Sequence, residues 1–189
     1  MPKIVDHEER RRAIASAAVD AIAANGLSGV KLTDIARTAG VTTGSIAHYF
    51  ADKDAVLAAA LEEVCTRLFI QIGTPDRPPT ANDIAAALPI NPERRKEWIV
   101  WLAYWGRAPH APALAQNHRQ YYAEIETAVA ENMAGTHPDP QLAAAAIISA
   151  VDGIGTRVTL EPDLWPADRQ RALLSELISP IIAAFQPKR

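Results

Sequence analysis

The residues from Lys31 to Lys53 combine apolar and polar side chains in a spacing that suits contact with DNA. Two short helices can meet across a turn at Gly40, because apolar residues recur where both helices would face inward: Leu32, Ile35, Ala36, Val41, Ile46 and Phe50. The second helix then presents an outward face made only of small or polar residues: Thr43, Gly44, Ser45, His48 and Tyr49. Such a face can enter the major groove, where side chains hydrogen-bond to base edges. The spacing therefore predicts a helix-turn-helix unit.

The segment KLTDIARTAGVTTGSIAHYFADK resembles the TetR family of bacterial repressors in its glycine-valine turn, its Thr-Gly-Ser helix start and its His-Tyr-Phe ending. In sequence the resemblance covers residues 8–70, and beyond them it lies mainly in the number and length of helices. It implies contacts with bases or nearby phosphates for one set of residues and with the DNA backbone for another: Thr43, Ser45 and His48 in the first set, and Thr33, Tyr49 and Lys53 in the second.

Ala47 departs from the family pattern, since many members carry a tyrosine there that leans on the DNA. A small residue before His-Tyr-Phe is similar to the choline-responsive BetI branch of the family. The later run WIVWLAYWGRAPHAPALAQNHRQYYAEI is similar to that branch as well. The resemblance thus implies a regulator released from DNA by a small molecule.

Hydrophobic periodicity is helical along the chain, with proline and glycine as breaks, so we expect an all-α fold of about nine helices. Residues 1–53 should form a three-helix head that contains the helix-turn-helix, and residues 54–189 a helical ligand-binding and dimerisation domain. Gly26, Gly40 and Gly73 are expected to end helices, and a further break is expected at Gly135. Three residues should cap helix starts: Thr33, Thr42 and Asp52. The expected helices cover residues 8–25, 34–39, 43–50, 53–72, 81–88, 92–107, 112–134, 141–160 and 166–185.

Aromatic residues are concentrated in the second half of the chain. Trp98, Trp101 and Trp105 fall on one helical stripe, and Tyr122 follows on the next expected helix. A packing seam explains each of them singly, because aromatic residues dominate protein cores. Together they suggest the wall of an effector pocket, in which the rings of Trp101, Trp105 and Tyr122 hold a quaternary ammonium by cation-π attraction. Two glutamates are candidate countercharges for that cation: Glu62 and Glu97.

The last two expected helices carry an apolar face that suits a two-fold four-helix interface. Gly153 and Gly155 would permit close approach of helices there. A homodimer built this way can place two recognition helices about 34 to 36 Å apart on successive major grooves of an operator. The alternative is that these residues close the core of a monomer.

Other classes of protein find little support in the sequence. The histidines lack partners at metal-ligand spacing and no serine lies in a nucleophile elbow, so an all-α enzyme is a weak alternative, and neither a metal nor a cofactor is expected. A ligand-independent architectural DNA-binding protein would need more positive charge than a net charge of -3. Asp152, before Gly153, is interpreted as a helix or interface feature. With one cysteine, no signal sequence and no membrane span expected, a cytoplasmic location is predicted.

Overall fold

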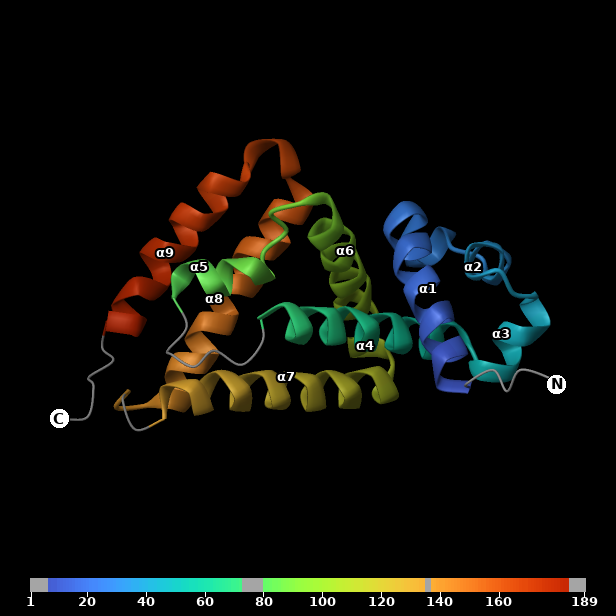
Figure 1. Cartoon of the computed structure of the whole chain (residues 1–189), viewed down its shortest axis with the longest axis horizontal. Helices are drawn as coiled ribbons and strands as arrows, with labels where there is room; N and C mark the ends of the chain where they lie inside the picture. Colours follow the sequence, from blue (N-terminus) through green and yellow to red (C-terminus); the bar gives the residue numbers. More distant parts are fainter. Residues whose placement is uncertain (1–6, 73–79, 135–136, 184–189) are drawn as a thin grey trace. The chain divides into compact units, whose positions relative to one another are not determined.

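A computed structural model describes residues 7–72, 80–134 and 137–183, and in them the chain is helical with no β-strand (Figure 1). The predicted all-α fold is confirmed. The helices are α1 (His7–Gly29), α2 (Leu32–Ala39), α3 (Thr43–Tyr49), α4 (Lys53–Ile72), α5 (Ala81–Ile84), α6 (Pro92–Arg107), α7 (Pro112–Met133), α8 (Pro140–Leu160) and α9 (Ala167–Ala183). Short 3-10 turns, η1 (Ala85–Ala87), η2 (Ala108–His110) and η3 (Pro162–Leu164), follow α5, α6 and α8.

The chain divides into two compact units. The first comprises Met1–Arg67 and Ile99–Ala115, and the second comprises Leu68–Trp98 and Gln116–Arg189. The first unit contains α1, α2 and α3, and the second contains α5, α8 and α9, while α4, α6 and α7 contribute residues to both.

In the first unit, α1 packs against α2, and α2 packs against α3 (Figure 1). The contacts bury apolar side chains such as Ile14, Ile22, Ile35 and Ile46. The regular part of α1 ends at Gly26, which has a φ of 66° and a ψ of 165°. This backbone conformation suits glycine, so the expected break is found, although one further turn of helix follows it.

The turn between α2 and α3 explains the relative placement of these helices. Gly40 adopts a left-handed conformation with φ 65° and ψ 33°. Its amide donates to the carbonyl of Arg37 at 3.3 Å, and the amide of Val41 donates to the carbonyl of Ala36 at 2.9 Å. These two bonds form a Schellman motif, which satisfies the last carbonyls of α2 and turns the chain sharply. The role predicted for Gly40 is therefore confirmed.

One predicted cap is wrong. Thr33 lies inside the first turn of α2, and Lys31 occupies the N-cap position without a capping side-chain bond. The helix begins earlier than expected because Leu32 joins its first turn. The other caps hold: Thr42 accepts from the amide of Ser45 at 3.2 Å, and Asp52 accepts from the amide of Ala55 at 2.8 Å.

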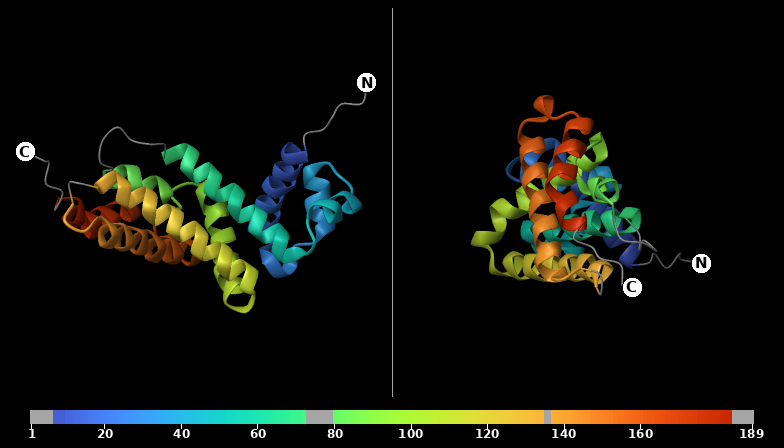
Figure 2. Two further views of the ribbon diagram at one scale, coloured as in Figure 1. Left: turned by 90° about the horizontal axis from the view of Figure 1, so that it is seen from below. Right: turned by 90° about the vertical axis from the view of Figure 1, so that its left-hand side faces the viewer.

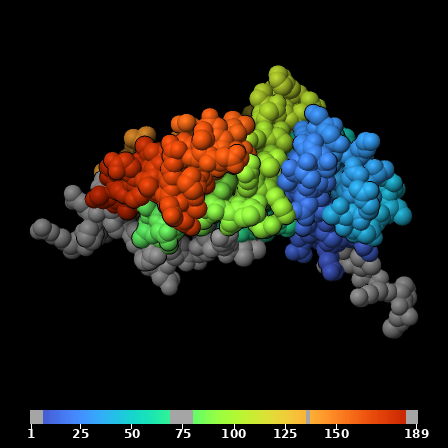
Figure 3. All heavy atoms as spheres, turned by 90° about the horizontal axis from the view of Figure 1, so that it is seen from above, coloured from blue at the N-terminus to red at the C-terminus, as the bar shows by residue number. Residues whose placement is uncertain are grey.

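The second unit is built around a cluster of apolar side chains. Helices α8 and α9 pack against each other, and α5 packs against α9 (Figure 2). The end of α8 and the described part of α9 also lie at the surface (Figure 3). The buried members of this cluster are Ala85, Leu88, Met133, Ala143, Ile147, Ile154, Val158, Trp165, Leu174 and Ile178.

By length and composition alone, α8 could cross a membrane, with a mean hydropathy of 1.3 in its most apolar window. A helix that packs in a protein core passes the same test. Its apolar character has a local explanation, because Ile147, Ile154 and Val158 enter the cluster from one face. Three sequence predictions lie outside the described residues: the stop at Gly73 with its following loop, the break at Gly135, and the end of the last helix near residue 185.

Candidate DNA-binding and effector sites

The outward face of α3 has the composition expected of a recognition surface. Thr43, Gly44 and His48 are exposed, whereas Ile46 is fully buried. Phe50, directly after the helix, is buried as well. Because these two apolar residues anchor the helix from its inner side, its polar side is held outward. The remaining predicted contacts are Thr33, which is exposed, and Ser45, Tyr49 and Lys53, which are half-buried.

The hydroxyl of Ser45 lies in the capping network of α3. Its oxygen is 3.0 Å from Oγ1 of Thr42, which also accepts from the Ser45 amide. The predicted capping role of Thr42 is thus confirmed, and the side chain of Ser45 is oriented by the cap. Lys53 opens α4, and its Nζ lies 3.5 Å from the carbonyl oxygen of Ser28, the residue before the end of α1.

An aromatic cluster at the end of α3 includes a residue that sequence reasoning missed. His7, the first described residue of α1, lies with its ring centroid 4.5 Å from that of Tyr49 and 6.0 Å from that of His48. His48 and Tyr49 are themselves 5.5 Å apart in an edge-on arrangement. The rings therefore restrict one another's orientation. His7 could not be found from the sequence because it lies far from the motif along the chain.

Ion pairs fix the helices of the first unit around this face. The guanidinium of Arg107 donates to both oxygens of Asp54, at 2.9 Å from Nε to Oδ1 and 2.8 Å from Nη2 to Oδ2. The hydrogen bond to Arg107 lowers the pKa of Asp54, against the opposing effect of burial. Arg11 in turn donates to Glu62 at 2.9 Å. The arginine run near the start of α1 thus supplies a bridge to α4.

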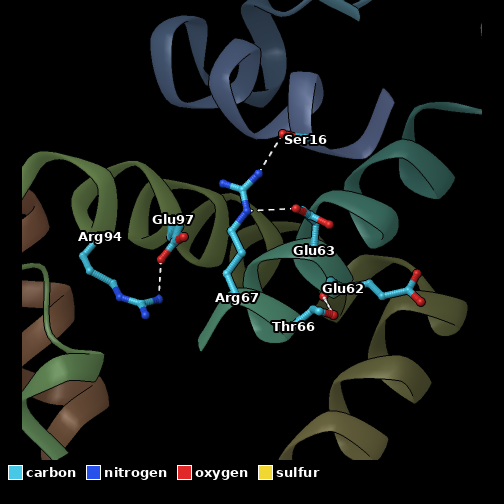
Figure 4. Close-up of polar contacts among 7 residues, drawn as sticks. All are labelled: Ser16, Glu62, Glu63, Thr66, Arg67, Arg94 and Glu97. Atoms are coloured by element: carbon cyan, nitrogen blue, oxygen red, sulfur yellow. Dashed lines mark hydrogen bonds and ion pairs between the residues drawn. The ribbon is translucent and has the colours of Figure 1, made fainter. Parts of the chain in front are cut away.

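Arg67 braces the same unit from α4. Its Nη2 donates to the hydroxyl of Ser16 on α1 at 2.7 Å, and its Nε donates to Glu63 at 2.9 Å (Figure 4). These bonds link α1, α4 and the end of α6. They therefore hold together the helices of the unit that carries α3.

Two of the predicted effector residues lie together in the first unit. The ring centroids of Trp101 and Trp105 are 5.7 Å apart and the ring planes are inclined by 44°. Beside them, Tyr104 is fully buried, and its hydroxyl donates to the carbonyl of Leu114 at 2.7 Å. Burial raises the pKa of Tyr104 to about 12. Tyr104 is thus a packing residue that ties α6 to α7.

Trp98 has a packing role in the second unit. Its indole N–H donates to the carbonyl of Ala87 at 2.8 Å, and its side chain is 5% exposed. The ring lies directly against Gly155 on α8, where an added Cβ would come within 2.1 Å of it. The close approach expected at Gly155 therefore occurs, with an indole ring as the neighbour. The assignment of Trp98 to an effector site stays a prediction.

Tyr122, the fourth predicted effector residue, joins a polar cluster in the second unit. Its hydroxyl donates to Oδ2 of Asp152 on α8 at 2.7 Å. The ring of His118, one turn earlier on α7, stacks on it with centroids 4.3 Å apart and an interplanar angle of 18°. Burial raises the pKa of Asp152 to about 6, while the bond from Tyr122 opposes this rise. Burial, together with the charge of Arg119, lowers the pKa of His118.

The two glutamates considered as countercharges already have cationic partners. Glu97 is buried, and its Oε2 lies 2.5 Å from Nη1 of Arg94, which is buried too (Figure 4). Glu62 is exposed and pairs with Arg11. Since both carboxylates are neutralised by an arginine, each is a poor anchor for a further cation.

Comparison with known proteins fits this geometry. Residues 14–60, which span most of α1 to α4, match the bacterial regulatory proteins of the tetR family. Residues 82–183 match the C-terminal region of BetI-type transcriptional repressors, and this match alone covers more than half of the chain. The chain belongs to the TetR family. It is a transcriptional regulator with a DNA-binding helix-turn-helix, and its relatives are regulators rather than enzymes.

Individual relatives agree with this assignment. The chain is 29% identical over 184 residues to the HTH-type transcriptional regulator BetI of Paraburkholderia phymatum, covering 92% of each chain. It is 28% identical to the regulator PksA of Bacillus subtilis, covering 96% of this chain and 94% of that one. A solved transcriptional regulator from Rhodococcus sp. Rha1 is similar with a TM-score of 0.83 and 26% identity, over 95% of this chain and 99% of that chain.

For a TetR-family regulator, Asp152 and His118 are the candidate site residues that sequence reasoning did not assign. From its place before Gly153, the sequence predicts only a helix or interface feature for Asp152. A signal was present nonetheless, because it is the one acidic residue within the apolar sequence of α8. Its pairing with Tyr122 is not visible in sequence, since the two lie 30 residues apart on different helices.

Proposed function

We propose that this TetR-family protein is a cytoplasmic repressor that binds a palindromic operator as a homodimer and is released by a small cationic molecule. The observation that carries the DNA-binding part is the exposed polar face of α3, held outward by buried Ile46 and Phe50. Two kinds of contact are proposed, with base edges or nearby phosphates for Thr43, Ser45 and His48, and with the DNA backbone for Thr33, Tyr49 and Lys53.

The surface of α8 supports the homodimer. Leu142 and Leu160 are 67% and 69% exposed, and they share one face because eighteen residues make about five helical turns. Between them on that face lies exposed Gly153, with open space around its Cα. Leu177 on α9 is 47% exposed as well. Large apolar side chains around a small residue suit close packing against the same helix of a second copy.

Two observations support a cationic effector. The chain matches the BetI-type C-terminal region, and a regulator from Saccharomonospora viridis was solved in complex with choline, with a TM-score of 0.69 and 23% identity over 92% of this chain and 97% of that chain. In this chain, the ring pair of Trp101 and Trp105 in the first unit and the Tyr122 cluster in the second offer aromatic faces that attract cations.

A mobility-shift assay with the DNA upstream of the chain's own gene tests the proposal. We expect a complex that prefers this DNA over a scrambled duplex, contains two protomers per operator, and weakens steeply as salt increases. Addition of choline should dissociate it. A complex without sequence preference would contradict operator recognition, and a complex with one protomer would contradict the dimer.

A further inference from the structure

We propose that Asp152, together with Tyr122 and His118, is the anionic anchor for the cationic group of the effector, an inference that rests on the ligand-responsive function proposed above. The cluster joins two helices of the second unit, with Asp152 on α8 and both aromatic residues on α7. Nothing in the fold of α8 requires a carboxylate at this position. Asp152 lies between Val151 and Gly153 in the middle of the helix, far from its capping residues.

The contacts of Asp152 leave its charge without a counterion. In the described part of the chain, its one hydrogen bond comes from the neutral hydroxyl of Tyr122, and it forms no salt bridge. A half-buried carboxylate with a single neutral donor pays a desolvation cost that this bond does not offset. A cation placed beside the free Oδ1 would supply the missing compensation.

The cationic side chains of the neighbouring elements do not act as a counterion for Asp152. On α8, Arg157 is exposed and lies 3.5 Å from Glu161. On α7, Arg119 is exposed and lowers the pKa of His118, without contributing to that of Asp152. Elsewhere in the same unit, Arg94 pairs with Glu97 on α6, and Arg171 pairs with Asp168 on α9.

The aromatic partners have the properties that a cation site needs. His118 is held in its neutral form at pH 7 by its lowered pKa, so it adds a ring face without adding a competing positive charge. The stack between His118 and Tyr122 fixes the phenol, and the phenol fixes the carboxylate through its hydroxyl. The site therefore offers one oriented carboxylate beside stacked rings, which is the arrangement that recognises ammonium groups.

Binding should then depend on pH. Burial raises the pKa of Asp152 to about 6, so the carboxyl is mainly protonated at pH 5 and mainly ionised at pH 8. Only the ionised form attracts a cation. Because a bound cation stabilises the carboxylate, affinity should increase as the pH rises through this range.

Calorimetry with choline and its neutral carbon isostere, 3,3-dimethylbutan-1-ol, tests the inference on the full chain. We expect choline to bind up to about tenfold more tightly at pH 8 than at pH 5, and the isostere to bind equally at both. In Asp152→Asn, which keeps an acceptor for the Tyr122 hydroxyl, choline should lose this pH dependence. Asp163→Asn, a charge removal at an exposed position of η3, should behave as the unmodified chain.

A second variant provides a readout that a structural role would not give. Tyr122→Phe removes the hydrogen bond that lowers the pKa of Asp152, so the midpoint of the choline pH profile should move to higher pH. An unchanged midpoint, equal choline affinity in Asp152→Asn, or no choline binding at either pH would each overturn the anchor. Operator binding is measured in the same preparations without choline. If the unmodified chain does not bind the operator, the proposed function is overturned instead of the anchor.

Discussion

The recognition face of α3 and the Asp152 cluster place polar groups in opposite environments. On α3, Thr43 and His48 are exposed, and the helix is anchored by apolar residues on its inner side. Around Asp152, a half-buried carboxylate lies between α7 and α8, and burial raises its pKa. The first arrangement costs little stability, because water solvates the polar groups until DNA replaces it. The second arrangement costs stability in the free protein, and a ligand can recover that cost.

One glycine from each region shows the same contrast between the surface and the interior of the protein. An added Cβ at Gly44 on α3 would lie 3.8 Å from Oγ1 of Thr42, an ordinary van der Waals distance. An added Cβ at Gly155 on α8 would come within 2.1 Å of the Trp98 ring. Gly44 thus leaves the surface of α3 open to close approach by DNA, whereas Gly155 leaves room for an indole ring inside the protein. Identical substitutions at the two positions should therefore have opposite consequences.

The largest effect is expected for Gly155→Ala. The methyl group cannot fit unless the indole of Trp98 moves, and that ring is held by its bond to Ala87. We expect the free energy of unfolding to fall by about 3 kcal/mol or more, at the upper end of overpacking costs. Urea unfolding followed by circular dichroism measures it. Gly153→Ala, two residues away on the same helix with open space around it, is the matched control and should be neutral or stabilising.

Asp152→Asn should have the next largest effect, and it should stabilise the free protein. The folded-state pKa is raised from 3.8 to about 6, so the folded protein binds the proton more tightly and loses stability as the pH rises through this window. A shift of this size corresponds to about 3 kcal/mol at most. The free energy of unfolding of the variant should therefore exceed that of the unmodified chain by an amount that increases from pH 4 to pH 8. Urea unfolding at several pH values checks this, and a pH-independent difference would contradict a half-buried carboxyl that ionises with a raised pKa.

The recognition region could be predicted from sequence because its determinants are local. The turn at Gly40, the Thr42 cap and the alternation of buried Ile46 with exposed His48 all lie within a dozen residues. The one misplaced cap, Thr33, also reflects local competition, since Leu32 extended the helix past it. Local patterns of this kind specify which side of a short helix faces the core.

The candidate effector region resisted prediction because its determinants are long-range. The sequence indicated an aromatic stripe but could not separate Trp98, which packs on Gly155, from residues that remain candidates for ligand contact. It also suggested Glu97 as a countercharge, although a buried arginine already neutralises it. Which carboxylate lacks a cationic partner depends on how α7 and α8 meet, and helical periodicity does not contain that information.

The smallest effect on stability is expected for Gly44→Ala, a substitution that tests the recognition face of α3. The fold accepts the methyl group, so alanine should leave stability unchanged or raise it by up to about 1 kcal/mol through its higher helix propensity. Operator affinity should nevertheless fall by up to about tenfold, because the added Cβ keeps the backbone of α3 away from the DNA. Mobility shifts and thermal unfolding on the same sample measure both quantities. Gly106→Ala, an exposed glycine on α6 with open space around it, controls for helix propensity alone. If the two variants bound the operator equally well, close approach at Gly44 would play no part in recognition, and the exposed face of α3 would have to act through its side chains alone.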